Sequence, residues 1–165
     1  FANILKFSDV EFCKICPTIT FESPGHDENT WKIFSIFKTN TIPSQGKIFN
    51  YLVISFGDSK SFLNHIYNLK IRSLVDTGVD INADDQIITL STCSYEFDDF
   101  RTVLVARRVR ENEDKTVDSN KIKSNKNPLM PECWYKKYGG TPPVYSDFES
   151  AYHAGEIDWF NENIY

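Results

Sequence analysis

The sequence of 165 residues contains no apolar run close to the roughly 20 residues that cross a membrane. We also expect no signal peptide in its first residues, although a start at Phe1 rather than Met indicates that something upstream has been removed. Four cysteines at irregular spacing are too few for a miniprotein built on disulfides. A basic excess is lacking too, with 18 Lys and Arg against 23 Asp and Glu. Nucleic-acid-binding proteins usually show such an excess, so we expect no nucleic-acid partner.

The composition is that of a folded domain, with 41% hydrophobic, 25% charged and 15% aromatic residues. The charge is uneven, with a net charge of -1 over residues 1–110 and -4 over residues 111–165. The change coincides with a polar run at residues 111–127 that contains neither Gly nor Pro and predicts a solvated linker. The sequence therefore divides into residues 1–110, a linker at 111–133 and an appendix at 134–165.

Strands are predicted where aromatic and β-branched residues cluster: residues 18–21, 31–38, 49–56, 86–90 and 102–109. Residues 23–30 read as a loop. Helices are predicted after capping-box patterns at Ser8 and Ser146, the first stopping before Pro17 and the second at Gly155. A longer helix begins at Asp58 or Ser59 and ends before Gly78, with apolar residues at helical spacing: Phe62, Leu63, Ile66, Leu69 and Leu74. The fold class is mainly β with a few helices.

One cysteine and one arginine stand where two predicted strands meet a common loop. Cys93 ends the strand that carries the string TLSTC, and Arg101 begins the next strand, RTVLVARRV. Antiparallel pairing would bring the two to the same end of a sheet. A nearby guanidinium favours a thiolate and can hydrogen-bond a carbonyl as negative charge develops on it. The alternative is that Cys93 is a small buried residue and Arg101 a surface cation.

The TLSTC string with its downstream arginine resembles the class B sortases, which are cysteine transpeptidases of Gram-positive cell surfaces. Three further segments support the resemblance: Phe1 to Phe7 is similar to the segment after the family's histidine loop, Trp31 to Ser35 to a core strand, and residues 59–73 to the helix that marks class B. The resemblance covers residues 1–110. It implies a closed β-barrel, here without its leading strands and histidine loop.

The resemblance implies roles for seven residues. Cys93 would be the nucleophile, and Arg101 the cation that binds the substrate and the oxyanion. The other five would bind substrate: Ser91, Thr92, Ser94 through its backbone N–H, Tyr51 and Leu52. No cofactor and no metal are implied.

The histidine is where this sequence departs from the family. The family's Gly-His loop would precede Phe1, and we assign its role to none of His26, His65 and His153, which read as surface residues, His65 on the polar side of its helix. We therefore expect the chain to be the C-terminal part of the catalytic domain, and inactive by itself.

The resemblance implies a transpeptidase that cleaves a sorting-signal peptide of surface proteins through a thioester and transfers it to a cell-wall amine. Its partners would be the sorting peptide and a peptidoglycan precursor amine. It would lie on the outer face of the cell membrane, held by an N-terminal anchor outside this sequence. The alternative is a non-catalytic peptide-binding module or an inactive fragment.

Two further features have two interpretations each. Cys13 and Cys16 have metal-site or redox spacing, but without a second pair we expect them to pack against the core. The appendix is rich in aromatic residues, which either pack on the outside of its own domain, as we expect, or form a docking surface: Trp134, Tyr135, Tyr138, Tyr145, Phe148, Tyr152, Trp159, Phe160 and Tyr165.

Overall fold

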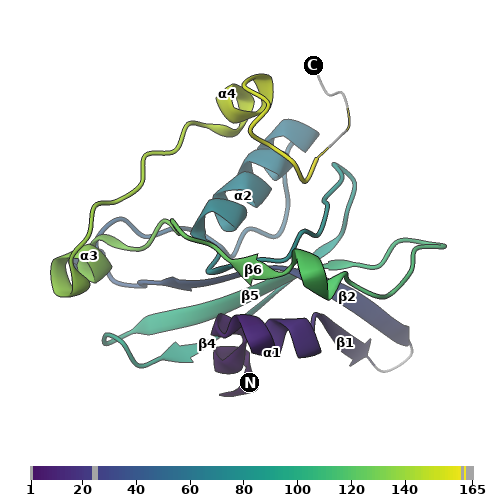
Figure 1. Cartoon of the computed structure of the whole chain (residues 1–165), viewed down its shortest axis with the longest axis horizontal. Helices are drawn as coiled ribbons and strands as arrows, with labels where there is room; N and C mark the ends of the chain where they lie inside the picture. Colours follow the sequence, from purple (N-terminus) through teal and green to yellow (C-terminus); the bar gives the residue numbers. More distant parts are fainter. Residues whose placement is uncertain (1, 24–25, 161, 163–165) are drawn as a thin grey trace.

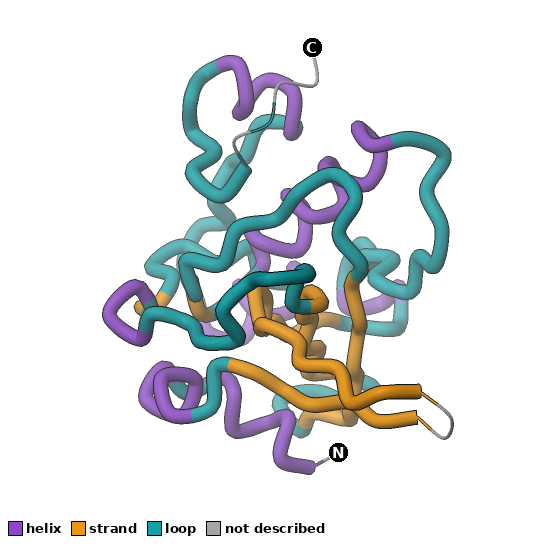
Figure 2. The backbone as a smooth tube through the Cα atoms, turned by 90° about the vertical axis from the view of Figure 1, so that its right-hand side faces the viewer, coloured by secondary structure: helices purple, strands orange, loops and turns teal. Residues whose placement is uncertain are grey.

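A curled, half-barrel sheet of four antiparallel strands forms the centre of the chain (Figure 1). The computed structural model describes residues 2–23, 26–160 and 162. The strand order is β1-β2-β5-β4, with these bounds: β1 Thr18–Ser23, β2 His26–Thr39, β5 Phe100–Arg108 and β4 Ile87–Ser94. In Figure 2 the strands β1 and β2 run side by side at the lower right. The mainly β fold class is confirmed.

The two central strands, β2 and β5, are buried on both faces of the sheet. Along β5, Val103 and Val105 enter one hydrophobic cluster while Leu104 and Ala106 enter the other, as the two-residue period of a strand requires. On β2 the pairing register shifts between Ile33 and Ser35. The extra residue interrupts the alternation, so that Ile33 and Ile36 face one cluster while Phe34 and Phe37 face the other.

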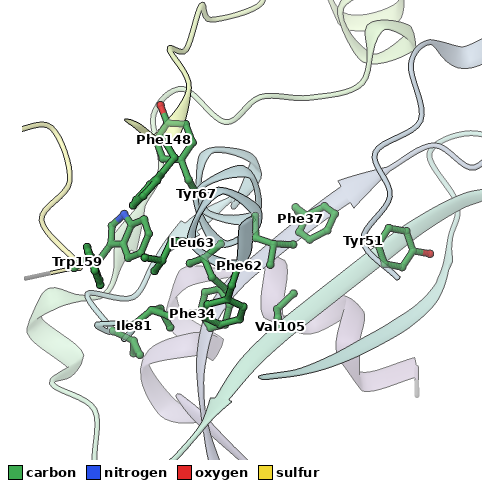
Figure 3. Close-up of a cluster of buried hydrophobic side chains, with 14 of the residues drawn as sticks. Phe34, Phe37, Tyr51, Phe62, Leu63, Tyr67, Ile81, Val105, Phe148 and Trp159 are labelled. Carbon is green, nitrogen blue, oxygen red and sulfur yellow. The ribbon is translucent and has the colours of Figure 1, made fainter. Parts of the chain in front are cut away.

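Each face of the sheet is covered by elements from elsewhere in the chain. The helices α2 (Ser59–Arg72) and α4 (Phe148–His153) lie over one face. Figure 3 shows this cluster, in which Phe34 and Val105 of the sheet lie close to Leu63 of α2. The other face is covered by η1 (Ala2–Ser8), α1 (Val10–Ile15) and the small sheet of β3 (Val75–Asp76) and β6 (Lys123–Ser124).

The predicted helices exist, but two of them begin one residue later than predicted. The N-caps of α1 and α4 are Asp9 and Asp147, not Ser8 and Ser146, because each carboxylate accepts a hydrogen bond from a backbone N–H of the first turn. The cap of α2 is Asp58.

The end of α2 also differs from the prediction. The helix ends at Arg72, and Leu74 lies beyond it, where its backbone N–H donates to the carbonyl of Ile36 at 2.6 Å. Gly78 therefore does not terminate the helix. It lies in the turn after β3, with a φ of 65° that favours glycine.

Four of the five predicted strands are confirmed in β1, β2, β4 and β5. The loop predicted at residues 23–30 is wrong, because β2 begins at His26 and its first residues pair back onto β1. The strand predicted at residues 49–56 is also wrong. This segment has no ladder partner among the described strands, and its Ile54 side chain is 97% exposed.

The division into two main parts joined by a linker stays a prediction, but the structure shows how the polar residues after β5 lie. They run along the domain and contact it: Glu113 forms ion pairs with Lys32 and Arg107, Ile122 is buried, and Lys123–Ser124 pair with β3. The 3-10 turn η3 (Ser119–Lys121) precedes β6. After the polar residues comes α3 (Glu132–Tyr138), a helix that the sequence did not predict.

Much of the aromatic appendix packs on its own domain. Phe148, Trp159 and Phe160 are buried in the same cluster as Tyr67 of α2 (Figure 3). The carbonyl of Trp159 also accepts a hydrogen bond from the backbone N–H of Ile81 at 2.9 Å. These contacts favour the first of the two interpretations. Tyr165 is outside the described residues.

No helix within the described part of the chain has the length and apolar character to span a membrane.

Candidate functional site

The structure pairs Cys93 with Arg101. The two are direct cross-strand partners, Cys93 near the end of β4 and Arg101 near the start of β5. Partners in an antiparallel ladder have side chains on the same face, with Cα atoms about 4.5–5.5 Å apart. Cys93 is exposed, whereas Arg101 is half-buried and donates from one guanidinium nitrogen to the carbonyl of Phe100 at 3.0 Å. Cys93 is therefore not the buried residue of the alternative interpretation.

A groove lies along the first part of β4, the strand that carries Cys93, where Ile87, Ile88 and Thr89 line it. The extended segment at residues 51–56 and the outer edge of β4 enclose a space of about 650 Å³. Tyr51 is buried, and its hydroxyl lies 3.2 Å from the hydroxyl of Ser91. Leu52 lines the same groove and is 66% exposed, and Thr92 is half-buried next to Cys93. Thus the structure brings Tyr51 and Ser91 into contact and leaves Leu52 open to a ligand.

The residues after Cys93 form a hydrogen-bonded turn around Glu96. The hydroxyl of the buried Ser94 donates to the Glu96 carboxylate and accepts from Thr102 at 3.1 Å. Lys38, on β2, forms an ion pair with the same carboxylate. Burial alone raises the pKa of Glu96, but the hydrogen bonds from Lys38 and Ser94 outweigh it and lower the pKa below its ordinary value.

The comparisons with known proteins agree with this geometry. Sortase B of Listeria monocytogenes is 32% identical over 98 residues, which are 59% of this chain and 37% of that protein. A solved sortase B of Clostridium perfringens is 28% identical and superposes with a TM-score of 0.56, covering 67% of this chain and 58% of that one. The chain is sortase B-like.

A substrate complex of Staphylococcus aureus sortase B has the same fold, with a TM-score of 0.58 over 68% of this chain and 50% of that one, at 23% identity. No protein-family model matches the chain. The sortase B-like chain spans between about a third and three fifths of the length of these relatives. The similarity therefore concerns only part of a sortase domain.

The three histidines of the sortase B-like chain lie on separate elements. His26 begins β2, whereas Thr39 at its other end pairs with Arg101, and a strand of that length spans up to about 40 Å. His153 ends α4. His65 is buried in α2, not on its polar side as predicted, with its ring stacked on Phe49 at 5.8 Å between centroids. Burial, and then Arg72, lower the pKa of His65.

All four cysteines are free thiols. Cys13 is buried and its thiol lies 3.0 Å from the carbonyl of Phe7, and burial raises its pKa to about 12. Cys13 and the half-buried Cys16 contact the same hydrophobic cluster, as predicted for a pair that packs against the core. Within residues 2–23, 26–160 and 162, no group of three or more His, Cys, Asp or Glu could hold a metal ion.

Sequence reasoning missed the residues that fix the turn after Cys93. Besides Lys38 and Glu96, they include Thr41, whose hydroxyl donates to the carbonyl of Asp99 at 2.6 Å, and Gln45, whose amide donates to that of Asp98 at 2.7 Å. These partners are more than fifty residues apart along the chain. Polar residues in two loops carry no spacing pattern that could have indicated such pairs.

Proposed function

We propose that this chain supplies the nucleophile end of a sortase-type transpeptidase active site, with Cys93 as the nucleophile. The observation that carries the proposal is the direct pairing of an exposed cysteine with an arginine, on a strand whose first part lines a groove. The Cys93 sulfur attacks a peptide carbonyl carbon, the C–N bond breaks, and the departing amine takes a proton. An acceptor amine then attacks the thioester, which forms a new amide and releases the Cys93 thiol.

Arg101 binds the developing oxyanion in this proposal, with the backbone N–H of Ser94 as a second donor. Its guanidinium stays protonated, so it stabilises charge but transfers no proton. The proton for the departing amine comes from the histidine of the family's Gly-His loop, a role that we assign to none of the three histidines of this sequence.

The substrate in this proposal is an extended sorting-signal peptide that lies in the groove between residues 51–56 and β4. Tyr51, Leu52, Ser91 and Thr92 contact it, and the exposed Leu52 and Ile54 side chains offer apolar surface to it. The acceptor is an amine of a peptidoglycan precursor. The protein acts on the outer face of a Gram-positive cell membrane, to which a segment outside this sequence attaches it.

Cleavage of a fluorogenic Asn-Pro-type sorting peptide by the full-length gene product tests the proposal. We expect Cys93→Ala to abolish cleavage, while Cys16→Ala and Cys133→Ala retain it. Full activity in Cys93→Ala would contradict the proposal. Binding of the peptide without cleavage by the wild type would instead support the alternative of a non-catalytic binding module.

A further inference from the structure

The loop that joins Cys93 to Arg101 is short and strained at one residue. It runs from 95 to 99 and is closed by the pairing of Ser94 with Phe100. Asp99 has a φ of 54°, a left-handed conformation that is uncommon for residues other than glycine. Because both ends of this loop carry a proposed reacting group, its conformation sets where Cys93 lies relative to Arg101.

The helix α3, in the aromatic appendix, packs against this loop. The Phe97 ring lies 6.3 Å from the ring of Trp134 and 6.1 Å from that of Tyr138, between centroids. The ammonium group of Lys137 donates to the carbonyl of Glu96 at 2.8 Å and lies 4.6 Å from the centre of the Phe97 ring. In Figure 1, α3 lies at the end of the sheet where the β4–β5 hairpin turns.

The same helix also contacts the loop that follows β2. A Cβ atom added to Gly46 would lie 2.8 Å from the Cβ of Glu132, so the helix approaches the backbone as closely as only glycine allows. The Glu132 carboxylate accepts from the backbone N–H of Lys47 at 3.5 Å. Since Gln45 in turn donates to the carbonyl of Asp98, α3 and the two loops form one connected unit.

The start of α3 is itself fixed to the chain before it. The hydroxyl of Tyr135 accepts from the backbone N–H of Met130 at 3.0 Å and donates to the carbonyl of Pro128 at 3.3 Å. The contact with the loop is therefore made by a helix with a fixed position.

We propose that α3 is a positioning element for the active site, in which Lys137 and Trp134 hold the 95–99 loop so that Cys93 stays opposite Arg101. This inference rests on the proposed function, since it assigns the C-terminal appendix a part in the same reaction. Neither residue touches the substrate or the reacting atoms. Their effect is transmitted through Glu96 and Phe97.

Two adjacent lysines of α3 offer a matched test. Lys137 contacts the loop, whereas Lys136 forms an ion pair with Glu132 in the same helix, at 4.0 Å. Both side chains are exposed, so Lys137→Met and Lys136→Met should both fold normally. We expect Lys137→Met to increase hydrogen exchange at amides 95–99 about fivefold and Lys136→Met to leave it unchanged.

In the full-length gene product, Lys137→Met should lower kcat for the sorting peptide by a similar factor with KM unchanged, because the groove is intact. Lys137→Arg should restore kcat, since a guanidinium can donate to the same carbonyl and stack on the same ring. Equal exchange and equal kcat in the two methionine variants would overturn the inference.

Failure of the inference and failure of the proposed function are distinguishable. If Cys93→Ala keeps its activity, the proposed function fails whatever α3 does. If Cys93→Ala is inactive and the two lysine variants behave alike, only the positioning role is wrong.

Discussion

The two ends of the four-stranded sheet are stabilised by different kinds of interaction. At one end, the buried Arg107 side chain binds Asp80 and Glu113, and the half-exposed Arg110 binds Asp80 and Asp85. At the other end, the Cys93–Arg101 hairpin is held by Lys38, by two loop hydrogen bonds and by partly exposed rings of α3. At both ends, some of the interacting residues follow β5 in the sequence.

The energetic consequence differs between the ends. Burial lowers the pKa of Arg107, but its hydrogen bonds to the carboxylates of Glu113 and Asp80 outweigh it and raise the pKa above its ordinary value. Removing one partner from a buried charge is costly, because the remaining charge stays desolvated. The exposed contacts at the hairpin contribute less each and are screened by water. We therefore expect the Arg107 end to determine stability and the Cys93 end to determine activity.

The largest effect should come from Arg101→Lys, which keeps the charge but loses the planar donor fork. Loss of an oxyanion donor typically lowers turnover ~100-fold or more. We expect that loss in steady-state cleavage of the sorting peptide by the full-length gene product, with an unchanged melting temperature. Arg108→Lys, at the other end of the same strand, is the control and should cleave normally. Near-normal turnover in Arg101→Lys would make Arg101 an ordinary surface cation.

The next effect should be on stability at the opposite end, in Glu113→Gln. This change removes the charge that faces Arg107 and Lys32, and hydrogen bonds to charged groups contribute about 2 kcal/mol. We expect denaturant unfolding at pH 7 to show a loss of that size, while the exposed Glu111→Gln shows almost none.

The pH dependence of the free energy of unfolding tests whether the charge of Glu113 carries this stabilisation. The Arg107 hydrogen bond comes first among the causes that lower the pKa of Glu113 below its ordinary value. A carboxyl with a depressed folded-state pKa stabilises above its unfolded pKa and loses that contribution as the pH falls. The difference in free energy of unfolding between wild type and Glu113→Gln should therefore become smaller below about pH 4.5. A constant difference down to pH 3 would contradict the ion-pair account.

The smallest effect should come from His65, which lies in α2 with its ring against Phe49 and Phe56. Its buried ring has an unpaired Nε2 and a lowered pKa, so the unfolded state binds the proton more readily. Stability should then be complete above about pH 6.5 and fall as the pH drops through that range. We expect the melting temperature of the wild type to fall by about 2–4 °C more than that of His65→Phe between pH 7.5 and 5. Parallel curves would show that His65 does not contribute.

Patterns within short segments predicted most of the fold. Strands β1, β2, β4 and β5 and helices α1, α2 and α4 follow from local alternation, helical spacing and caps. The Cys93–Arg101 pair could also be predicted, because two strands joined by a short loop must pair at that end. The observed N-caps of α1 and α4 lie one residue after the predicted ones. Each Ser-Asp pair offers two side chains that can cap a helix, and in both helices the aspartate carboxylate is the cap.

The remainder depended on contacts between distant residues. Residues 49–56 have the composition of a strand, but pairing depends on a neighbour that composition does not provide. The polar run after β5 reads as solvated, yet Glu113 binds the sheet because the buried Arg107, near the end of β5, needs a partner. The role of α3 was hidden for the same reason, since nothing local links Lys137 to Glu96.

The most direct test of the account is to capture the acyl-enzyme. The full-length gene product would be mixed with a sorting-type peptide, quenched in acid within seconds, digested and mapped by mass spectrometry. The account predicts the acyl part of the peptide attached to the fragment that contains Cys93, labile to hydroxylamine and absent from Cys93→Ala. Peptide cleavage with no adduct on Cys93, or with the adduct on another residue, would contradict it.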